Sequence, residues 1–168
     1  MAVDGPDPTG TTPLDEEERR QLKPAHITTR SELNEWEQAN ISEAFDWALS
    51  RRRGRRPPLL SDTYVRSLHK RMLGKTWKWA GEYRTTERNI GIAPWQIGEQ
   101  VRIHPFPNGN GRHARLMTDV LLRSLGRELF TWGGGNLETA GDARTRYLEA
   151  LRAADRGELG LLMRFVRS

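Results

Sequence analysis

Residues 103–115 combine a histidine, a glycine-spaced turn and two arginines, and their sequence is IHPFPNGNGRHAR. Gly109 and Gly111 allow backbone N–H groups to converge on an anion, and the N-terminus of a following helix adds partial positive charge. Arg112 and Arg115 are three residues apart, so both can project to one side of that helix and bind phosphate oxygens. The imidazole of His104 is available as a base. The stretch predicts a site that handles a nucleotide polyphosphate.

The common nucleotide-binding motifs do not explain this site. The chain has no Walker pattern with its lysine and no GxGxxG pattern, so the sequence excludes a P-loop and a dinucleotide fold of the usual type.

Composition and length favour a soluble globular protein. The chain has 168 residues, of which 29% are charged and 36% hydrophobic, which suits one domain with a single core. It contains no cysteine, which excludes disulfides and thiolate metal sites and fits the cytoplasm. No apolar run reaches membrane-spanning length, and the N-terminus lacks an apolar signal segment. We therefore expect a cytoplasmic protein with no membrane partner.

The net charge of +5 raises the question of nucleic-acid binding. Much of the excess lies in the arginine-rich run at residues 51–56, a pattern typical of a solvated loop or helix end. No aromatic residues alternate with these charges, so nucleic acid is the minor interpretation.

The elements that must hold the site are mostly helical. Residues 31–50 place apolar side chains at helical spacing, and Ser61 and Gly74 are suited to begin and end a second helix. The glycine turn predicts a third helix over 112–125, and two more are expected near 138–154 and 158–167.

Two segments differ from this helical pattern. Residues 1–13 are rich in Gly, Pro, Thr and Asp, which predicts a flexible tail. Between residues 77 and 97 the composition changes to Thr, Tyr, Ile, Trp and Gly with turn residues, which predicts a short β-hairpin.

The residues from His104 to Arg115 resemble the core motif of the Fic (Fic/Doc) family, His-x-Phe-x-Asp/Glu-Gly-Asn-Gly-Arg-x-x-Arg. The resemblance extends to the segment from Trp77 to Arg84 and to residues 147–157, and it is closest to the subgroup called mobile mystery protein B. It implies that residues 14–168 form a Fic domain, a helical bundle that carries a short β-hairpin flap. It also implies an enzyme that transfers part of a nucleotide, most often AMP from ATP, to a Ser, Thr or Tyr hydroxyl of a target protein.

The resemblance assigns a role to each matching residue. His104 would be the general base, and Gly109, Asn110 and Gly111 would hold the α- and β-phosphates. Arg112 would neutralise the β-phosphate and Arg115 would bind the γ-phosphate. Phe106 would anchor the loop in the core. The other histidines, His26, His69 and His113, are expected to be structural or to lie at the surface.

The sequence departs from the family pattern at Asn108, where an acidic residue usually binds Mg²⁺. An amide oxygen can ligate Mg²⁺ or Mn²⁺ but brings no negative charge, so Asn108 would be a weak ligand for the metal that accompanies ATP. Three hypotheses stay open: AMP transfer, phosphate transfer of the kind performed by Doc proteins, and a catalytically weak module that binds nucleotide. A second departure is that only residues 98–102 separate the hairpin from the motif, where the family has helical sequence.

Residues 28–34 resemble an inhibitory segment that many Fic proteins carry at a helix start. On that alignment Glu32 would pair with Arg115 and occupy the γ-phosphate position, with Glu35 as a second candidate. The alternative is an ordinary helix start with favourable acidic residues in its first turn, and both interpretations stay open.

The predicted hairpin would form a flap that docks the target through main-chain hydrogen bonds. The flap residues expected to do so are Thr85, Thr86, Asn89, Ile90 and Gly91. A small antitoxin or regulator is a further candidate partner.

Overall fold

We describe the fold from a computed structural model of the chain. The structure describes residues 19–27, 29–50, 58–85, 105–135, 137 and 141–168.

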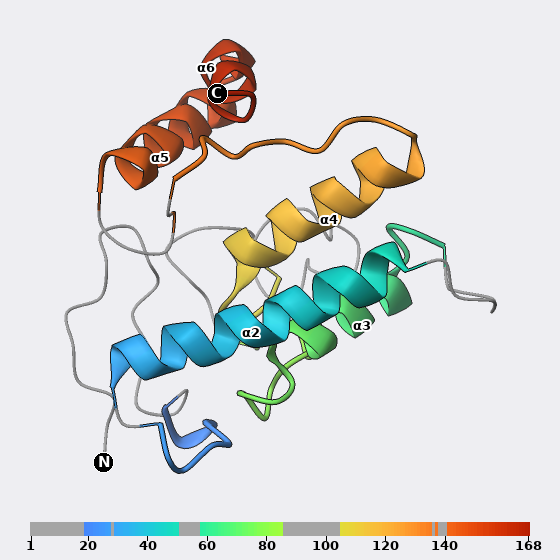
Figure 1. The fold of residues 1–168 in the computed structure, drawn as a ribbon, viewed down its shortest axis with the longest axis vertical. Coiled ribbons are helices and arrows are strands. Elements are labelled where there is room, and N and C mark those ends of the chain that lie inside the picture. The colour runs from blue at the N-terminus through green and yellow to red at the C-terminus, as the bar shows by residue number, and fades with distance from the viewer. Residues whose placement is uncertain (1–18, 28, 51–57, 86–104, 136, 138–140) are drawn as a thin grey trace. The chain divides into compact units, whose positions relative to one another are not determined.

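The described chain is mostly helical and forms two compact units (Figure 1). The first unit ends at Gly126 and contains helices α2, α3 and α4; α2 packs against α3, and α4 contacts both. The second unit spans Arg127–Ser168 and contains α5 and α6, which pack against each other. The complete glycine turn lies in the first unit.

Helix α2 spans Arg30–Leu49 and begins with a capping box. The Thr29 side chain accepts a hydrogen bond from the Glu32 backbone N–H, and the Glu32 carboxylate accepts one from the Thr29 N–H at 2.9 Å. These reciprocal bonds satisfy donors that a helix start otherwise leaves without partners. One stripe of the helix is buried and consists of Leu33, Glu37, Asn40, Ala44 and Ala48.

Helices α3 and α4 bring the glycine turn into the core of the first unit. Helix α3 spans Asp62–Leu73, with Ser61 as N-cap and Gly74 as C-cap, as the sequence predicts. Helix α4 spans Asn110–Ser124 and begins two residues earlier than predicted. Its N-cap is Gly109, whose φ of 75° lies in the left-handed region that glycine adopts without steric cost.

The core of the first unit consists of buried apolar side chains from all three helices and from the segment that follows α3. Its fully or nearly buried members are Ile27, Leu33, Ala44, Ala48, Tyr64, Leu68, Met72, Leu73, Trp77, Trp79, Ala80, Leu116 and Val120.

The second unit has its own small core. Helix α5 spans Asp142–Asp155 and α6 spans Leu159–Phe165. Tyr147 and Ala150 from α5 pack with the C-terminal Phe165 and Val166 and with Leu137. The two predicted C-terminal helices are therefore present.

The predicted fold class, mostly α, is confirmed by the described residues. The hairpin prediction falls largely on residues 86–97, and the flexible tail on residues 1–13; both lie outside the described residues. Within the part of the chain that the structure describes, no helix is long and apolar enough to cross a membrane.

Candidate nucleotide-phosphate site

Phe106 anchors the predicted phosphate loop in the core. Its side chain is fully buried and stacks on the imidazole of His69, with ring centroids 3.5 Å apart and planes 5° apart. The imidazole of His113 meets the Phe106 ring edge-on, with ring centroids 5.1 Å apart. The prediction that Phe106 holds the loop, rather than contacting substrate, agrees with this packing.

Asn110 closes the loop through its side chain. Its Oδ1 accepts a hydrogen bond from the Phe106 N–H at 2.9 Å, and its Nδ2 donates to the Phe106 carbonyl at 2.8 Å. The amide thus bonds to both backbone groups of one residue. In this arrangement the Asn110 side chain shapes the loop, and its backbone N–H lies in the first turn of α4, where helix N–H groups have no intrahelical partner.

Asn108 and Gly109 form the tightest part of the turn. The Gly109 N–H donates to Asn108 Oδ1 at 2.6 Å, and Gly109 itself is buried. A Cβ at Gly109 would collide with Leu73 Cδ1 and would lie 3.5 Å from His69 Nε2. Both the positive φ and the close approach of α3 therefore require glycine at this position.

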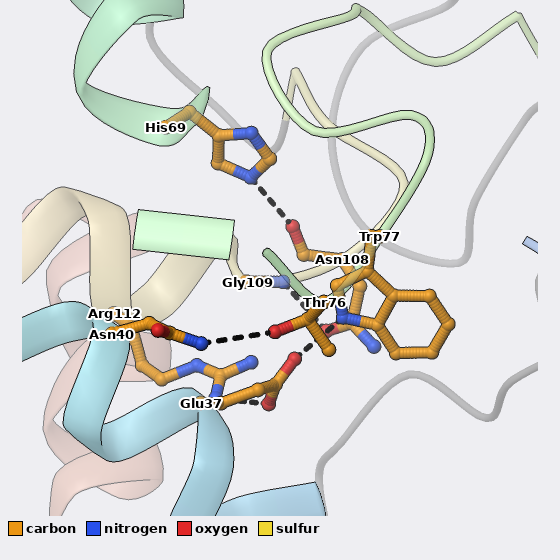
Figure 2. Close-up of polar contacts among 8 residues, drawn as sticks. All are labelled: Glu37, Asn40, His69, Thr76, Trp77, Asn108, Gly109 and Arg112. Atoms are coloured by element: carbon orange, nitrogen blue, oxygen red, sulfur yellow. Dashed lines mark hydrogen bonds and ion pairs between the residues drawn. The ribbon is translucent and has the colours of Figure 1, made fainter. Parts of the chain in front are cut away.

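His69 of α3 binds the loop at the Asn108 carbonyl, as Figure 2 shows. The Gly81 N–H donates to His69 Nδ1 at 3.0 Å, so the proton must sit on Nε2, which donates to the Asn108 carbonyl at 3.1 Å. Burial, with a smaller contribution from His113, lowers the pKa of His69 to about 3. The ring is therefore neutral at physiological pH and connects the turn at Gly81 with the loop.

His113 is a second buried, neutral histidine. Its Nε2 lies 3.1 Å from the Val65 carbonyl, a contact that requires a proton on that nitrogen, and burial lowers its pKa to about 4. Both histidines act as packing and hydrogen-bonding groups, which agrees with the structural role expected for them.

Arg112 forms an ion pair with Glu37 of α2. Its Nη1 lies 2.5 Å from Glu37 Oε2, and only 13% of the arginine side chain and 4% of the glutamate side chain are exposed. The other carboxylate oxygen, Oε1, accepts a hydrogen bond from the buried Trp77 indole N–H at 2.6 Å. Glu37 therefore joins α2, the segment after α3 and the start of α4 (Figure 2).

Arg115 lies in the second turn of α4. A Cβ added to Gly111 would sit 3.6 Å from Arg115 Nη1, so the guanidinium passes close to the glycine turn. Both predicted phosphate-binding arginines are therefore near the loop, at the end of α4 where the helix dipole is positive.

The acidic residues predicted to inhibit the site have local partners. Glu32 completes the capping box with Thr29, and the Glu35 carboxylate accepts a hydrogen bond from the Ser31 hydroxyl at 3.5 Å. Glu32 therefore has a local role in the helix cap, and its predicted inhibitory role stays a prediction.

Glu37 is a carboxylate of α2 that contacts the motif at Arg112, and the sequence-based predictions did not include it. The signal was its position: Glu37 lies four residues after Leu33 and seven before Ala44, within an otherwise largely apolar stripe. A charged residue in a buried stripe is seldom retained without a partner.

Several predicted site residues cannot be placed. The predicted base, His104, lies outside the described residues, and so do four of the predicted flap residues: Thr86, Asn89, Ile90 and Gly91. The fifth flap residue, Thr85, is exposed at the end of a described segment. Among the side chains that are described, no group of three His, Asp or Glu could hold a metal ion. Asn108 is the candidate ligand from the sequence, and its Oδ1 already accepts the Gly109 N–H.

We compared the chain with known proteins. No family model matches it. It is 32% identical over 91 residues to a Fido domain-containing protein from Dictyostelium discoideum, an alignment covering 53% of this chain. The chain spans 58% of the length of that relative. This similarity supports membership of the Fic, or Fido, family.

Proposed function

We propose that this chain is a protein nucleotidyltransferase that moves AMP from ATP to a Ser, Thr or Tyr hydroxyl of a target protein. The observation that carries the proposal is the glycine turn that opens α4, which His69, Phe106 and Asn110 fix in place. A rigid set of backbone amides at a helix N-terminus is suited to hold phosphates without reorganisation. The similarity to a Fido domain-containing protein supports a Fic-like function in general, of which AMP transfer is the proposed form.

In the proposed reaction, the target hydroxyl oxygen attacks the α-phosphorus of ATP. The bond from that phosphorus to the oxygen bridging the α- and β-phosphates breaks, and pyrophosphate leaves. The hydroxyl proton passes to the imidazole of His104. Since the Gly109 N–H already donates to Asn108 Oδ1, the backbone amides of Asn110 and Gly111 would hold the phosphates. The guanidinium groups of Arg112 and Arg115 would stabilise the polyphosphate charge with them.

Magnesium or manganese would enter this site with the nucleotide. The protein offers the neutral oxygen of Asn108, whose second lone pair is compatible with a hard cation, so the phosphates of ATP would supply most of the ligands. The ion would neutralise charge on the polyphosphate.

Asn108 also favours a second candidate, a module that binds nucleotide with little or no catalysis, since a neutral ligand weakens metal binding. Phosphate transfer, in which the hydroxyl attacks the γ-phosphorus and ADP leaves, is the neighbouring enzymatic alternative.

Labelled ATP separates these candidates. The chain would be incubated with candidate target proteins, Mg²⁺ or Mn²⁺, and ATP labelled with ³²P at either the α or the γ position. AMP transfer puts only the α label on protein, and phosphate transfer puts only the γ label. His104→Ala is the control, and the absence of any label that depends on His104 would leave the binding module as the function.

Other parts of the proposal concern the setting of the enzyme. We propose a cytoplasmic location, restraint by α2, a hydroxyl-bearing target docked at residues 85–91 and a small antitoxin as regulator. The mobile mystery protein B subgroup remains a prediction. Mass spectrometry of proteins incubated with ATP and the chain would identify the target through the mass of its AMP adduct.

A further inference from the structure

Glu37 is a buried carboxylate at the centre of the first unit. It is 3% exposed and lies on the stripe of α2 that also buries Leu33 and Ala44. Removing a carboxylate from water is costly unless close partners compensate the charge. The position of Glu37 is therefore explained by what it contacts.

Both oxygens of Glu37 are held by partners from other segments. Trp77, 1% exposed, donates its indole N–H to Oε1, and Arg112 binds Oε2. The backbone of Trp77 is itself fixed, since its N–H donates to the Leu73 carbonyl at 2.9 Å. Moving the carboxylate away would leave a buried indole N–H and a partly buried guanidinium without these bonds, so a displacement of Glu37 is costly.

Arg112 directly follows the glycine turn, where the proposed polyphosphate would bind. Its side chain is only 13% exposed, and its guanidinium is anchored on a carboxylate that cannot easily move. Glu37 of α2 therefore helps to determine how the guanidinium is oriented and how strongly it attracts phosphate. Glu37 and Arg112 are 75 residues apart in the chain.

We propose that Glu37 is a positioning residue and permanent counter-charge for Arg112, which makes α2 part of the nucleotide site. This rests on the proposed function, which assigns the β-phosphate to Arg112. Glu37 orients the guanidinium and offsets its charge while no nucleotide is bound, and it limits the attraction of Arg112 for a β-phosphate. Since Trp77 shares the carboxylate, a phosphate that binds Arg112 also changes the hydrogen bond at the Trp77 indole.

The effect depends on which phosphates a ligand carries. ADP has the β-phosphate that would contact Arg112, whereas AMP lacks it. Replacing Glu37 by glutamine removes the offsetting charge and keeps the size of the side chain. ADP should then bind several-fold more tightly and AMP equally well.

The first experiment is a binding titration of wild type, Glu37→Gln and Glu43→Gln with ADP and with AMP. Glu43 is the matched control, since it also lies on α2 and pairs with a cation, Lys75, at 2.6 Å, but this pair is exposed. We expect a lower Kd for ADP in Glu37→Gln alone. An unchanged or raised Kd for ADP, or an equal shift for AMP, would overturn the proposal.

The second experiment needs no folded Glu37 variant. In a ¹H–¹⁵N spectrum of the wild-type chain, the Trp77 indole resonance, assigned with Trp77→Phe, should shift on addition of ADP and stay in place with AMP. ADP bound without that shift, or no ADP binding at all, would overturn the role of Glu37. The α-label assay decides AMP transfer separately, so a failure of the proposed function is distinguishable from a failure of this inference.

Discussion

Asn108 contributes two oxygens to the loop: its carbonyl accepts from His69 and its Oδ1 accepts from the Gly109 N–H. An aspartate at this position could accept the same bond from Gly109, so the turn does not require an amide. What the amide changes is charge at the point where a metal would meet the nucleotide.

We therefore expect Asn108→Asp to bind ATP at a lower Mg²⁺ concentration than wild type, since a carboxylate adds a charged oxygen ligand. The measurement is a titration of ATP binding with Mg²⁺. Asn108→Ala, which removes the ligand and the acceptor for Gly109, is the control and should need more Mg²⁺. An identical Mg²⁺ midpoint in all three proteins would contradict a role for this side chain in metal binding.

Gly109 and Gly111 differ in what a methyl group would meet. At Gly109, alanine would adopt a φ of 75° and collide with Leu73, so we expect a loss of about 2–4 kcal/mol in the free energy of unfolding. At Gly111 a Cβ would lie 3.6 Å from Arg115 Nη1, an ordinary contact. Gly111→Ala should therefore be neutral or slightly stabilising within α4, and urea unfolding of both variants compares the two positions.

At the scale of elements, the start of α2 has two possible purposes. The capping box between Thr29 and Glu32 stabilises the helix locally, whereas the resemblance to an inhibitory segment assigns Glu32 a role at the nucleotide site. Variants of Thr29 and Glu32 separate these purposes. Both residues belong to the cap, but only Glu32 is predicted to inhibit the enzyme.

Thr29→Ala should lower the free energy of unfolding by about 1 kcal/mol through loss of the cap. Glu32→Gly should also weaken the helix start. If Glu32 restrains the enzyme, only Glu32→Gly will raise AMP transfer in the α-label assay. Equal activity in wild type and both variants would remove the inhibitory role and leave the cap as the function of Glu32.

At the scale of the whole molecule, two neutral histidines are buried in the unit that holds the loop. Their pKa values lie below the ordinary 6.5, at about 3 for His69 and about 4 for His113. Below pH 6.5 the unfolded chain takes up protons at these positions while the folded protein does not. Stability is therefore highest above pH 6.5 and falls as the pH decreases toward the folded-state values.

Each of these histidines should contribute a slope of at most about 1.4 kcal/mol per pH unit across this range. The measurement is the free energy of unfolding in urea at several values between pH 7 and pH 5. His113→Gln, which can still donate to the Val65 carbonyl but does not titrate, should show a shallower slope than wild type. A slope equal to that of wild type would contradict the assignment of a lowered pKa to His113.

Local physics made much of this protein predictable from its sequence. The N-cap Ser61, the C-cap Gly74 and the periodic apolar residues act over a few neighbouring positions, so they specify helices without information from distant residues. The motif around Gly109 was equally visible, since its turn and the following helix are contiguous.

The contacts that complete the site were decided by tertiary structure. Glu37 meets Arg112 across 75 residues and Trp77 across 40, and His69 meets Asn108 across 39. Such pairs form only after α2, α3 and α4 pack, and no local pattern states which carboxylate will face which guanidinium. Sequence resemblance assigned an inhibitory role to Glu32 and Glu35, which stays a prediction, and it assigned none to Glu37. Glu37 was found only through its burial, because a charge inside the core must have a partner there.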